Sequence, residues 1–309
     1  IPVRSAMLVG FGLIALTSLF PIVTVLGYGQ IAEWWARANA WKETALHRAA
    51  FSGDHVLAKK LIDAGDKVNA KGADGAAPLH RAAFWGHVAV TELLLSRGAK
   101  VDIKNKEGRT PLHRAAFKGH DVVVGLLLAG GANATVGDKE GRTPLHRAAF
   151  GGRKDVAELL LASGAKVDVR NKEGRTPLHR AAFKGHTDVA ELLLARGAEV
   201  DAKDDEGLTP LHRAACAGRE GVAELLLARG AEIDAEDKRG WTPLHHACFN
   251  GRRTVAKLLL TRGARVDAKD REGQTPMLLA AAEGHMNVAG LFVASSADVV
   301  GDKISGQER

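Results

Sequence analysis

The feature that most constrains this chain is a period of 33 residues. A phrase close to Thr-Pro-Leu-His-Arg-Ala-Ala-Phe recurs eight times at intervals of 33 residues, with no insertion or deletion between copies. The block Asn105–His120 returns unchanged as Asn171–His186. A fixed period of this length predicts a solenoid of stacked units, because each unit can bury its apolar face only against a neighbour. The copies of the phrase open at Thr44, Ala77, Thr110, Thr143, Thr176, Thr209, Thr242 and Thr275.

Each period predicts two short helices followed by a turn or hairpin. In the fifth unit, Thr176 suits a helix N-cap, and Pro177 fits the first helical position, where no backbone donor is needed. Gly185 ends this helix. A second helix with a run of leucines closes at Gly197, a position suited to left-handed backbone. Residues 198–207 then predict the turn or hairpin that leads into the next unit.

This pattern resembles the ankyrin repeat family from about Lys42 to Val300. The resemblance rests on Thr-Pro-Leu-His, then Ala-Ala, Gly-His, a leucine run and Gly-Ala, as in Thr176–Ala198. It implies an all-α solenoid of helix-turn-helix and hairpin units over residues 44–300, with a tail at 301–309. Ala45 replaces the expected proline in the first unit, and the His-Arg pair is missing from the last. Such departures are expected where a unit lacks a neighbour on one side.

A charge-free segment at the amino terminus predicts a transmembrane helix over residues 1–32. No charged residue occurs between Ser5 and Ala32, and residues 7–26 can cross about 30 Å of hydrocarbon as a helix. A buried core helix and an uncleaved signal peptide are the alternatives. Residues 33–43 contain three tryptophans, which form either an interfacial belt or a cap on the first repeat. These are Trp34, Trp35 and Trp41.

The flanking charge and the cysteines indicate where the repeats lie. Most basic residues near the segment follow it, which favours repeats on the cytoplasm-like side. Cys216 and Cys248 occupy helical positions and are interpreted as small buried hydrophobes in a reducing compartment. We therefore expect a single-pass membrane protein whose repeats face the cytosol, a stroma or a matrix.

Composition and motifs favour a binding protein over an enzyme. The net charge of +7 suits acidic protein partners or anionic lipid. No nucleic acid is expected, because no basic run is interleaved with aromatic residues outside the repeat. His245-His246-Ala247-Cys248 resembles the palmitoyl-transfer motif Asp-His-His-Cys but lacks the Asp and has an intervening Ala. We predict no catalytic residue, no cofactor and no metal site.

Histidine is the fourth residue of the first seven phrases, and the resemblance gives this position a structural role. Its ring is expected to bond backbone near the hairpin, and helices packed about 8–10 Å apart are too distant for shared metal ligation. Histidines that follow a glycine at the helix exit, such as His87 and His120, are interpreted in the same way. The recurring histidines are His47, His80, His113, His146, His179, His212 and His245.

An arginine follows this histidine in six units, and a phenylalanine three residues later lies on the same helical face. The resemblance places this face in the concave groove where partners bind. Lys118 and Lys184 lie beside it, Trp85 is the first candidate for an apolar anchor, and Trp241 is the second. The candidate groove residues are Arg48, Phe51, Arg81, Phe84, Arg114, Phe117, Arg147, Phe150, Arg180, Phe183 and Arg213.

Two interpretations of the Arg–Phe series stay open. The series forms either a groove for an acidic segment, or a cation–π ladder in which each guanidinium covers a phenylalanine of its own or the next repeat. For the whole chain, we predict a membrane-anchored scaffold for protein–protein interaction. The alternative is a structural accessory subunit of a larger membrane complex, including an organellar one, whose other helices pack on the apolar segment.

Overall fold

The structure, a computed structural model, describes residues 43–292. Helices alternate along these residues, without a strand between residues 43 and 292. The first helices of the repeats are α4 (Ala45–Ser52), α6 (Pro78–Trp85), α8 (Pro111–Lys118), α10 (Pro144–Gly151), α12 (Pro177–Lys184), α14 (Pro210–Ala217), α16 (Pro243–Phe249) and α18 (Pro276–Ala282). The second helices are α5 (His55–Asp63), α7 (Val88–Ser96), α9 (Asp121–Ala129), α11 (Lys154–Ala162), α13 (Thr187–Ala195), α15 (Glu220–Ala228) and α17 (Arg253–Thr261). A further helix begins at residue 286 and reaches the end of the described residues.

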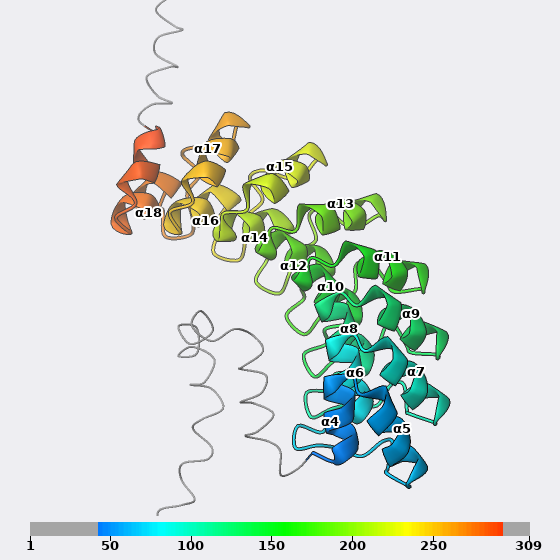
Figure 1. Cartoon of the computed structure of the whole chain (residues 1–309). Helices are drawn as coiled ribbons and strands as arrows, with labels where there is room; N and C mark the ends of the chain where they lie inside the picture. The colour runs from blue at the N-terminus through cyan, green and yellow to red at the C-terminus, as the bar shows by residue number, and fades with distance from the viewer. Residues whose placement is uncertain (1–42, 293–309) are drawn as a thin grey trace, which may run out of the picture.

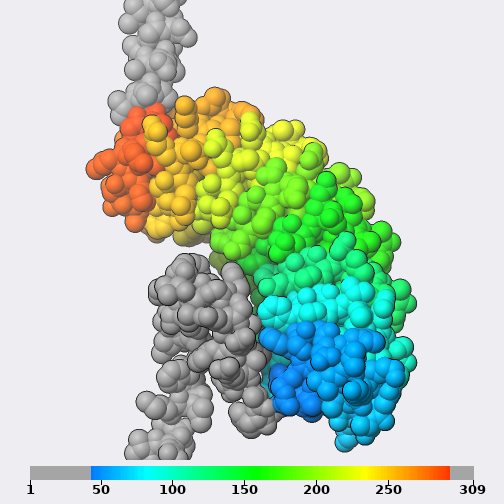
Figure 2. Space-filling view, in the orientation of Figure 1, coloured from blue at the N-terminus to red at the C-terminus, as the bar shows by residue number. Residues whose placement is uncertain are grey.

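The helix pairs stack into a curved solenoid, as the period predicts. Each first helix packs against its own second helix and against the first helices of adjacent repeats. Figure 1 shows the first helices and the inter-repeat loops on the inner side of the curve, and the second helices on the outer side. The space-filling view shows that the inner side is concave along the stack (Figure 2).

Small and branched side chains fill the space between helices. The leucine of the repeated phrase is no more than 1% exposed in the first seven repeats, as at Leu145 and Leu178, and the two small residues three and four positions later are equally buried. Alanine at most of these positions lets neighbouring first helices approach closely. From α7 to α17, each second helix adds a fully buried leucine, such as Leu160. Each such leucine stabilises the fold by about 1.5–3 kcal/mol through the hydrophobic effect.

The histidine of the phrase joins one repeat to the next, which confirms its predicted structural role. The backbone N–H of Thr110 donates to Nδ1 of His113 (3.2 Å), so Nε2 carries the proton and donates to the carbonyl of Arg142 (2.9 Å). Burial lowers the pKa of His113 to about 4 and keeps the ring neutral, as an acceptor at Nδ1 requires. The same bonds recur at His80, His146, His179, His212 and His245.

The residue that precedes each second helix joins it to the previous repeat. His120 donates from Nε2 to the carbonyl of Phe84 (3.0 Å), and Arg153 donates from Nε to the carbonyl of Phe117 (3.3 Å). Gly86, which ends α6, has a φ of 77°, and a Cβ there would lie 2.5 Å from the His120 ring. Both backbone conformation and space therefore require glycine at this position.

From the third repeat on, the loops between repeats are held by a short acidic or amide side chain, five residues before each phrase. Oδ1 of Asp138 accepts from the backbone N–H groups of Glu140 (2.9 Å) and Arg142 (3.0 Å). Adjacent loops are joined by single backbone bonds, such as Lys139 N–H to the carbonyl of Glu107 (3.0 Å). These loops therefore form a continuous row along the stack.

The predicted membrane helix (1–32), the interfacial segment with Trp34, Trp35 and Trp41, and the tail (301–309) lie outside the described residues. Among residues 43–292, no helix is long and apolar enough to cross a membrane.

Candidate partner-binding groove

The predicted arginine series lies on the first helices, along the concave side of the solenoid (Figure 1). Arg48 is exposed and Arg81 is buried. The other four are half-buried, and each has a different set of partners. These four are Arg114, Arg147, Arg180 and Arg213.

In the fourth, sixth and seventh repeats, the aspartate of the preceding loop pairs with the basic residue of the first helix. Arg147 binds Asp138 at 2.6 Å, and Arg213 binds Asp204. In the seventh repeat His246 replaces arginine and lies 3.0 Å from Asp237. These aspartates are nearly inaccessible to solvent, so the pairs are internal parts of the stack. Arg147, Arg213 and His246 therefore carry less free charge than the sequence suggests.

Where the loop carries asparagine, the arginine lacks this partner. The identical blocks Asn105–His120 and Asn171–His186 both contain such an asparagine. In the first block, Glu107 binds Arg109 at 2.6 Å and also lies 3.6 Å from Arg114. In the second, the matching Glu173 binds Arg175 at 2.6 Å, and Arg180 has no ion pair within residues 43–292.

Arg81 differs from all of these. It forms ion pairs with Glu43 and with Asp74 (3.2 Å to Asp74), and its side chain is 10% exposed. This arginine is therefore a buried link between the first two repeats, with little surface for a partner.

The aromatic series packs against cations of the following repeat. Lys118 Nζ lies 4.6 Å from the centre of the Phe84 ring, with the Arg114 guanidinium 5.8 Å from the same ring. The arrangement repeats two units later, where Lys184 and Arg180 lie 4.4 and 5.4 Å from Phe150. The closest cations thus cover the phenylalanine of the preceding repeat, not of their own or the next one. Cation–π contacts of about 0.5–1 kcal/mol each link these repeats.

Three other phenylalanines of the series extend this surface. Phe117 stacks on Phe150 at 6.3 Å between ring centres, and Phe51 packs on Trp85. Phe183 is 39% exposed, and the following repeat has Ala217 at the position of Lys184. The cation near the Phe183 ring is Lys184 of its own repeat, at the longer distance of 6.0 Å. The aromatic surface is therefore most open at Phe183.

Neither predicted tryptophan anchor projects freely into solvent. Trp85 is half-buried and packs edge-on against Phe51 and Phe84, at 5.1 and 5.2 Å between ring centres. Trp241 is 8% exposed, and its Nε1 donates to Asp270 (2.8 Å). Trp241 therefore packs within the stack and bonds the loop before the eighth repeat, which leaves little of its ring for a partner.

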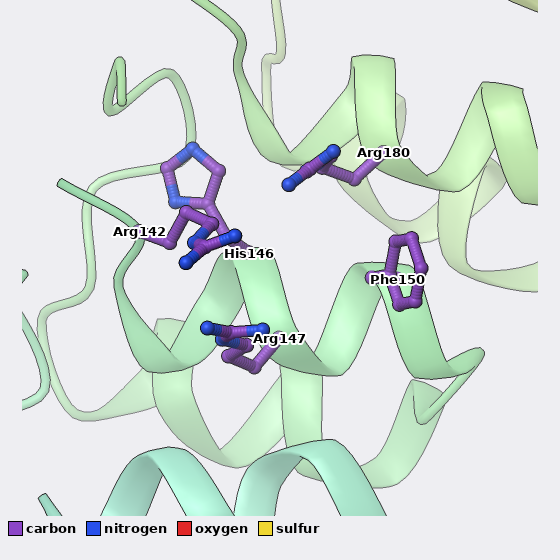
Figure 3. A pocket seen from close by; sticks show the side chains of 5 residues that line it. All are labelled: Arg142, His146, Arg147, Phe150 and Arg180. Atoms are coloured by element: carbon purple, nitrogen blue, oxygen red, sulfur yellow. The ribbon is translucent and has the colours of Figure 1, made fainter. Parts of the chain in front are cut away.

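A small pocket opens between the fourth and fifth repeats. Figure 3 shows the guanidinium groups of Arg142, Arg147 and Arg180 around one space, with His146 and Phe150 completing its lining. Its volume is about 80 Å³. Three guanidinium groups thus share one pocket. Within residues 43–292, the one carboxylate that forms ion pairs with these three groups is that of Asp138.

The sequence interpretation missed the loop residues that decide the state of the arginines. Asp138, Asp204 and Asp237 alternate with Asn105 and Asn171 at one position of the repeat, and this alternation was the available signal. Arg142, which joins the pocket from the loop, was not among the predicted groove residues.

The His-His-Ala-Cys segment has no nucleophilic character. Cys216 and Cys248 are free, and burial raises the pKa of Cys248 to about 12, so the thiol stays protonated. Between residues 43 and 292, no group of three or more His, Cys, Asp or Glu side chains could hold a metal ion.

Comparison with known proteins agrees with the geometry. The family described as ankyrin repeats (3 copies) matches residues 22–105, 98–171, 161–237 and 233–301, so the first match begins within the segment predicted to span a membrane. The crystal structure of the human ASB11 ankyrin repeat domain superposes with a TM-score of 0.67 and 32% identity, covering 72% of this chain and 99% of that one.

A curated relative matches over a much shorter stretch. This relative, a Na(+), Li(+), K(+)/H(+) antiporter subunit from Vreelandella zhaodongensis, is 68% identical over 34 residues, which is 11% of this chain. The chain spans 12% of the length of that relative. The family match and the solved structure each cover most of the chain, and both are made of ankyrin repeats. This chain therefore belongs to the ankyrin repeat family.

Proposed function

We propose that this protein is an interaction scaffold that binds an acidic protein segment along its concave groove. The observation that carries this proposal is the half-buried surface of alternating cations and aromatic rings on α6, α8, α10 and α12. Arginine and aromatic residues are enriched among the residues that dominate binding energy at protein interfaces. A partner with carboxylates and apolar side chains would match both components of this surface.

The charges available to a partner are those that the fold does not neutralise. Lys118 and Lys184 contact rings and form no ion pair within the described part of the chain, and Arg180 likewise has none. Arg147 and Arg213 hold buried aspartates, so their replacement would disturb the fold as well as the surface. A binding test therefore uses the two lysines and leaves Arg147 and Arg213 in place.

The first experiment is gentle extraction of the chain, native size separation and mass spectrometry of the proteins that travel with it. The variant Lys118→Gln/Lys184→Gln should lose the partner or weaken its binding by about tenfold or more, because each lysine would contribute a charge-assisted contact. Circular dichroism should show an unchanged helical signal.

The matched control removes the same charge from the outer side of the solenoid. Lys154 on α11 and Lys257 on α17 are exposed on second helices, and Lys154→Gln/Lys257→Gln should bind the partner normally. If both double variants behave alike, net charge and not the concave groove governs binding.

We also propose that residues 1–32 anchor the scaffold in a membrane, with the repeats on a reducing side. The support is the 28-residue segment without a charged side chain. Deletion of residues 1–42 should release the repeats from a carbonate-washed membrane pellet into the supernatant. Retention of the shortened chain in the pellet would exclude this segment as the anchor.

The alternative role as a stoichiometric component of a larger membrane complex is tested by the same native separation. A fixed ratio of the chain to a large assembly would favour that role, whereas migration alone would favour a tethered adaptor. No ion transport is proposed from the similarity to the antiporter protein, because the 34 matched residues amount to about one repeat.

A further inference from the structure

At two positions of the concave surface the loop carries asparagine instead of the aspartate that pairs with the arginine, and at one of them, Arg180, no ion pair forms within residues 43–292. Arg147 and Arg213 each bind the aspartate of their own loop, Asp138 and Asp204. In the fifth repeat the equivalent loop residue is Asn171, an uncharged amide that is 7% exposed. Arg180 therefore keeps an unneutralised charge at the point where its neighbours along the stack are paired.

The surroundings of Arg180 increase this excess of positive charge. Glu173, the nearest acidic residue on its own loop, is bound to Arg175 at 2.6 Å. Asp138 is shared by two other arginines of the pocket, Arg142 (3.1 Å) and Arg147 (2.6 Å). Burial lowers the pKa of Arg180, and the positive charges of Arg142, Arg175 and Arg213 lower it further, while Glu173 raises it.

Unused hydrogen-bond donors lie at the same place. The Nε–H groups of Arg147 and Arg180 are buried and have no acceptor among residues 43–292, and the same holds for those of Arg109 and Arg213 elsewhere on the stack. A buried donor without an acceptor is destabilising, and an incoming acceptor would recover part of that loss. The pocket volume of about 80 Å³ exceeds the roughly 10–15 Å³ that one water molecule needs, and it lies well below the roughly 300–1,000 Å³ of drug-sized ligand sites. This is room for a small anionic group but not for a drug-sized molecule.

We infer that the pocket formed by Arg142, Arg147 and Arg180 binds a single carboxylate from an acidic partner peptide, which supplies the charge that Asn171 lacks. The assignment rests on the proposed function and names the point of contact within it. A carboxylate is favoured over a phosphate because two of the pocket arginines, Arg142 and Arg147, already bind a carboxylate, that of the buried Asp138. A dianion would also be repelled more strongly by Asp138.

The chain contains its own control for this inference. Arg114 belongs to the same sixteen-residue sequence as Arg180, but it faces a different preceding repeat. Where Arg180 faces Arg142 and Asp138, the equivalent positions before Arg114 are Ala76 and Gly72. Arg114 also retains Glu107 at 3.6 Å. Identical substitutions in the two blocks therefore compare the pocket with its nearest counterpart.

The test measures binding of a capped hexaglutamate peptide to the purified full chain by calorimetry, with capped hexaglutamine as the neutral reference. Arg180→Gln should weaken hexaglutamate binding by about tenfold, which is about 1.4 kcal/mol at 25 °C. Arg114→Gln should change it by less than about twofold, because Arg114 lies outside the pocket and a single charge that already faces Glu107 contributes little.

A second pair of variants introduces the missing carboxylate into the chain itself, at the asparagine of the loop. Asn171→Asp should fold normally, because Asp138 makes the equivalent loop bonds to backbone N–H groups that Asn171 makes. The new aspartate should pair with Arg180, raise the melting temperature and weaken hexaglutamate binding by about tenfold. Asn105→Asp should leave the binding within about twofold.

Several outcomes would overturn the inference. These are equal losses in the two arginine variants, undiminished binding by Asn171→Asp, or no preference for hexaglutamate over hexaglutamine. A tenfold preference for a phosphoserine hexapeptide that depends on Arg180 would replace the carboxylate with a phosphate. If these tests fail while the natural partner still requires Lys118 and Lys184, this pocket is excluded and the proposed scaffold function stands.

Discussion

At the scale of single residues, this solenoid depends on which atom a side chain presents and on where that atom lies. His120 and Arg153 differ in shape and charge, yet each donates to a carbonyl near the end of the first helix one repeat earlier. The histidine of the repeated phrase, such as His113, is less replaceable, because it must accept at Nδ1 and donate at Nε2 at once. Only a neutral imidazole does both, and burial keeps it neutral.

This requirement predicts a loss of stability in mild acid. Burial lowers the pKa of His80, His113 and His146 from 6.5 to about 4. Between these values the unfolded chain binds more protons than the folded chain, so stability is full above pH 6.5 and decreases as the pH falls towards 4. We expect the melting temperature, followed by circular dichroism, to decrease steadily from about pH 7 to about pH 4.5.

The carboxylates do not produce this decrease. Burial raises the pKa values of Asp138 and Asp204, but their arginine partners outweigh it and hold both values below 3.8. These side chains therefore stay ionised throughout this range. A melting temperature that stays constant from about pH 7 to about pH 4.5 would contradict the neutral-histidine cap.

At the scale of the element, each of the first helices α4, α6, α8, α10 and α12 has two functions that its sequence does not separate. Its buried side carries the leucine and alanines that pack the stack, and its concave side carries the cation and the aromatic ring. Whether the cation is structural depends on the loop before the helix. Asp138 makes Arg147 part of the fold, whereas Asn171 leaves Arg180 available.

This difference predicts unequal costs for the same substitution. Arg147→Ala should destabilise the chain by about 1–3 kcal/mol, because the fully buried carboxylate of Asp138 would keep only weaker partners. Arg180→Ala should cost about 1 kcal/mol or less, the value of its contact with Phe150. Urea unfolding measures both.

The cause is checked by removing the carboxylate as well. Asp138→Asn combined with Arg147→Ala should recover part of the lost stability, since no charge is then left buried. An equal cost for the two single variants would show that the Asp138 pair contributes nothing to the fold.

At the scale of the whole molecule, stability is distributed along one dimension. Each repeat contacts its immediate neighbours. The hydrogen bonds made by the phrase histidines and by the loops, within residues 43–292, also join adjacent repeats. Stability in such a stack approximates a sum of repeat and interface contributions. Local damage should therefore spread to adjacent repeats and then diminish.

This architecture predicts a local response to a core mutation. Leu178 on α12 is fully buried, and Leu178→Ala should cost about 2–5 kcal/mol. In hydrogen–deuterium exchange, α10 to α15 should exchange faster, while α6, α7 and α17 should stay nearly unchanged.

Leu159 on α11, which is 37% exposed, provides the control. Leu159→Ala should leave exchange close to that of the natural chain, because an exposed side chain removes little buried area. Uniform acceleration along the chain in Leu178→Ala would instead indicate a single cooperative unit.

The order of helices and turns could be predicted from the sequence because every determinant is local and repeated. The threonine cap, the proline at the first helical position, the buried leucine and the closing glycine act within a few residues of one another. The structure confirms the solenoid, the structural role of the phrase histidines and the glycines at the helix ends. The predicted membrane segment lies outside the residues that the structure describes.

The state of the groove could not be predicted in this way, because it depends on the neighbouring repeat. Asn105–His120 and Asn171–His186 are the same sixteen residues, yet Arg114 lies beside Glu107 and Arg180 lies in a pocket with Arg142 and Arg147. Trp241 likewise could be placed on a loop, but its burial follows from contacts with the next unit. Local sequence determined the repeat, and only the stacking decided which of its charges remain unpaired.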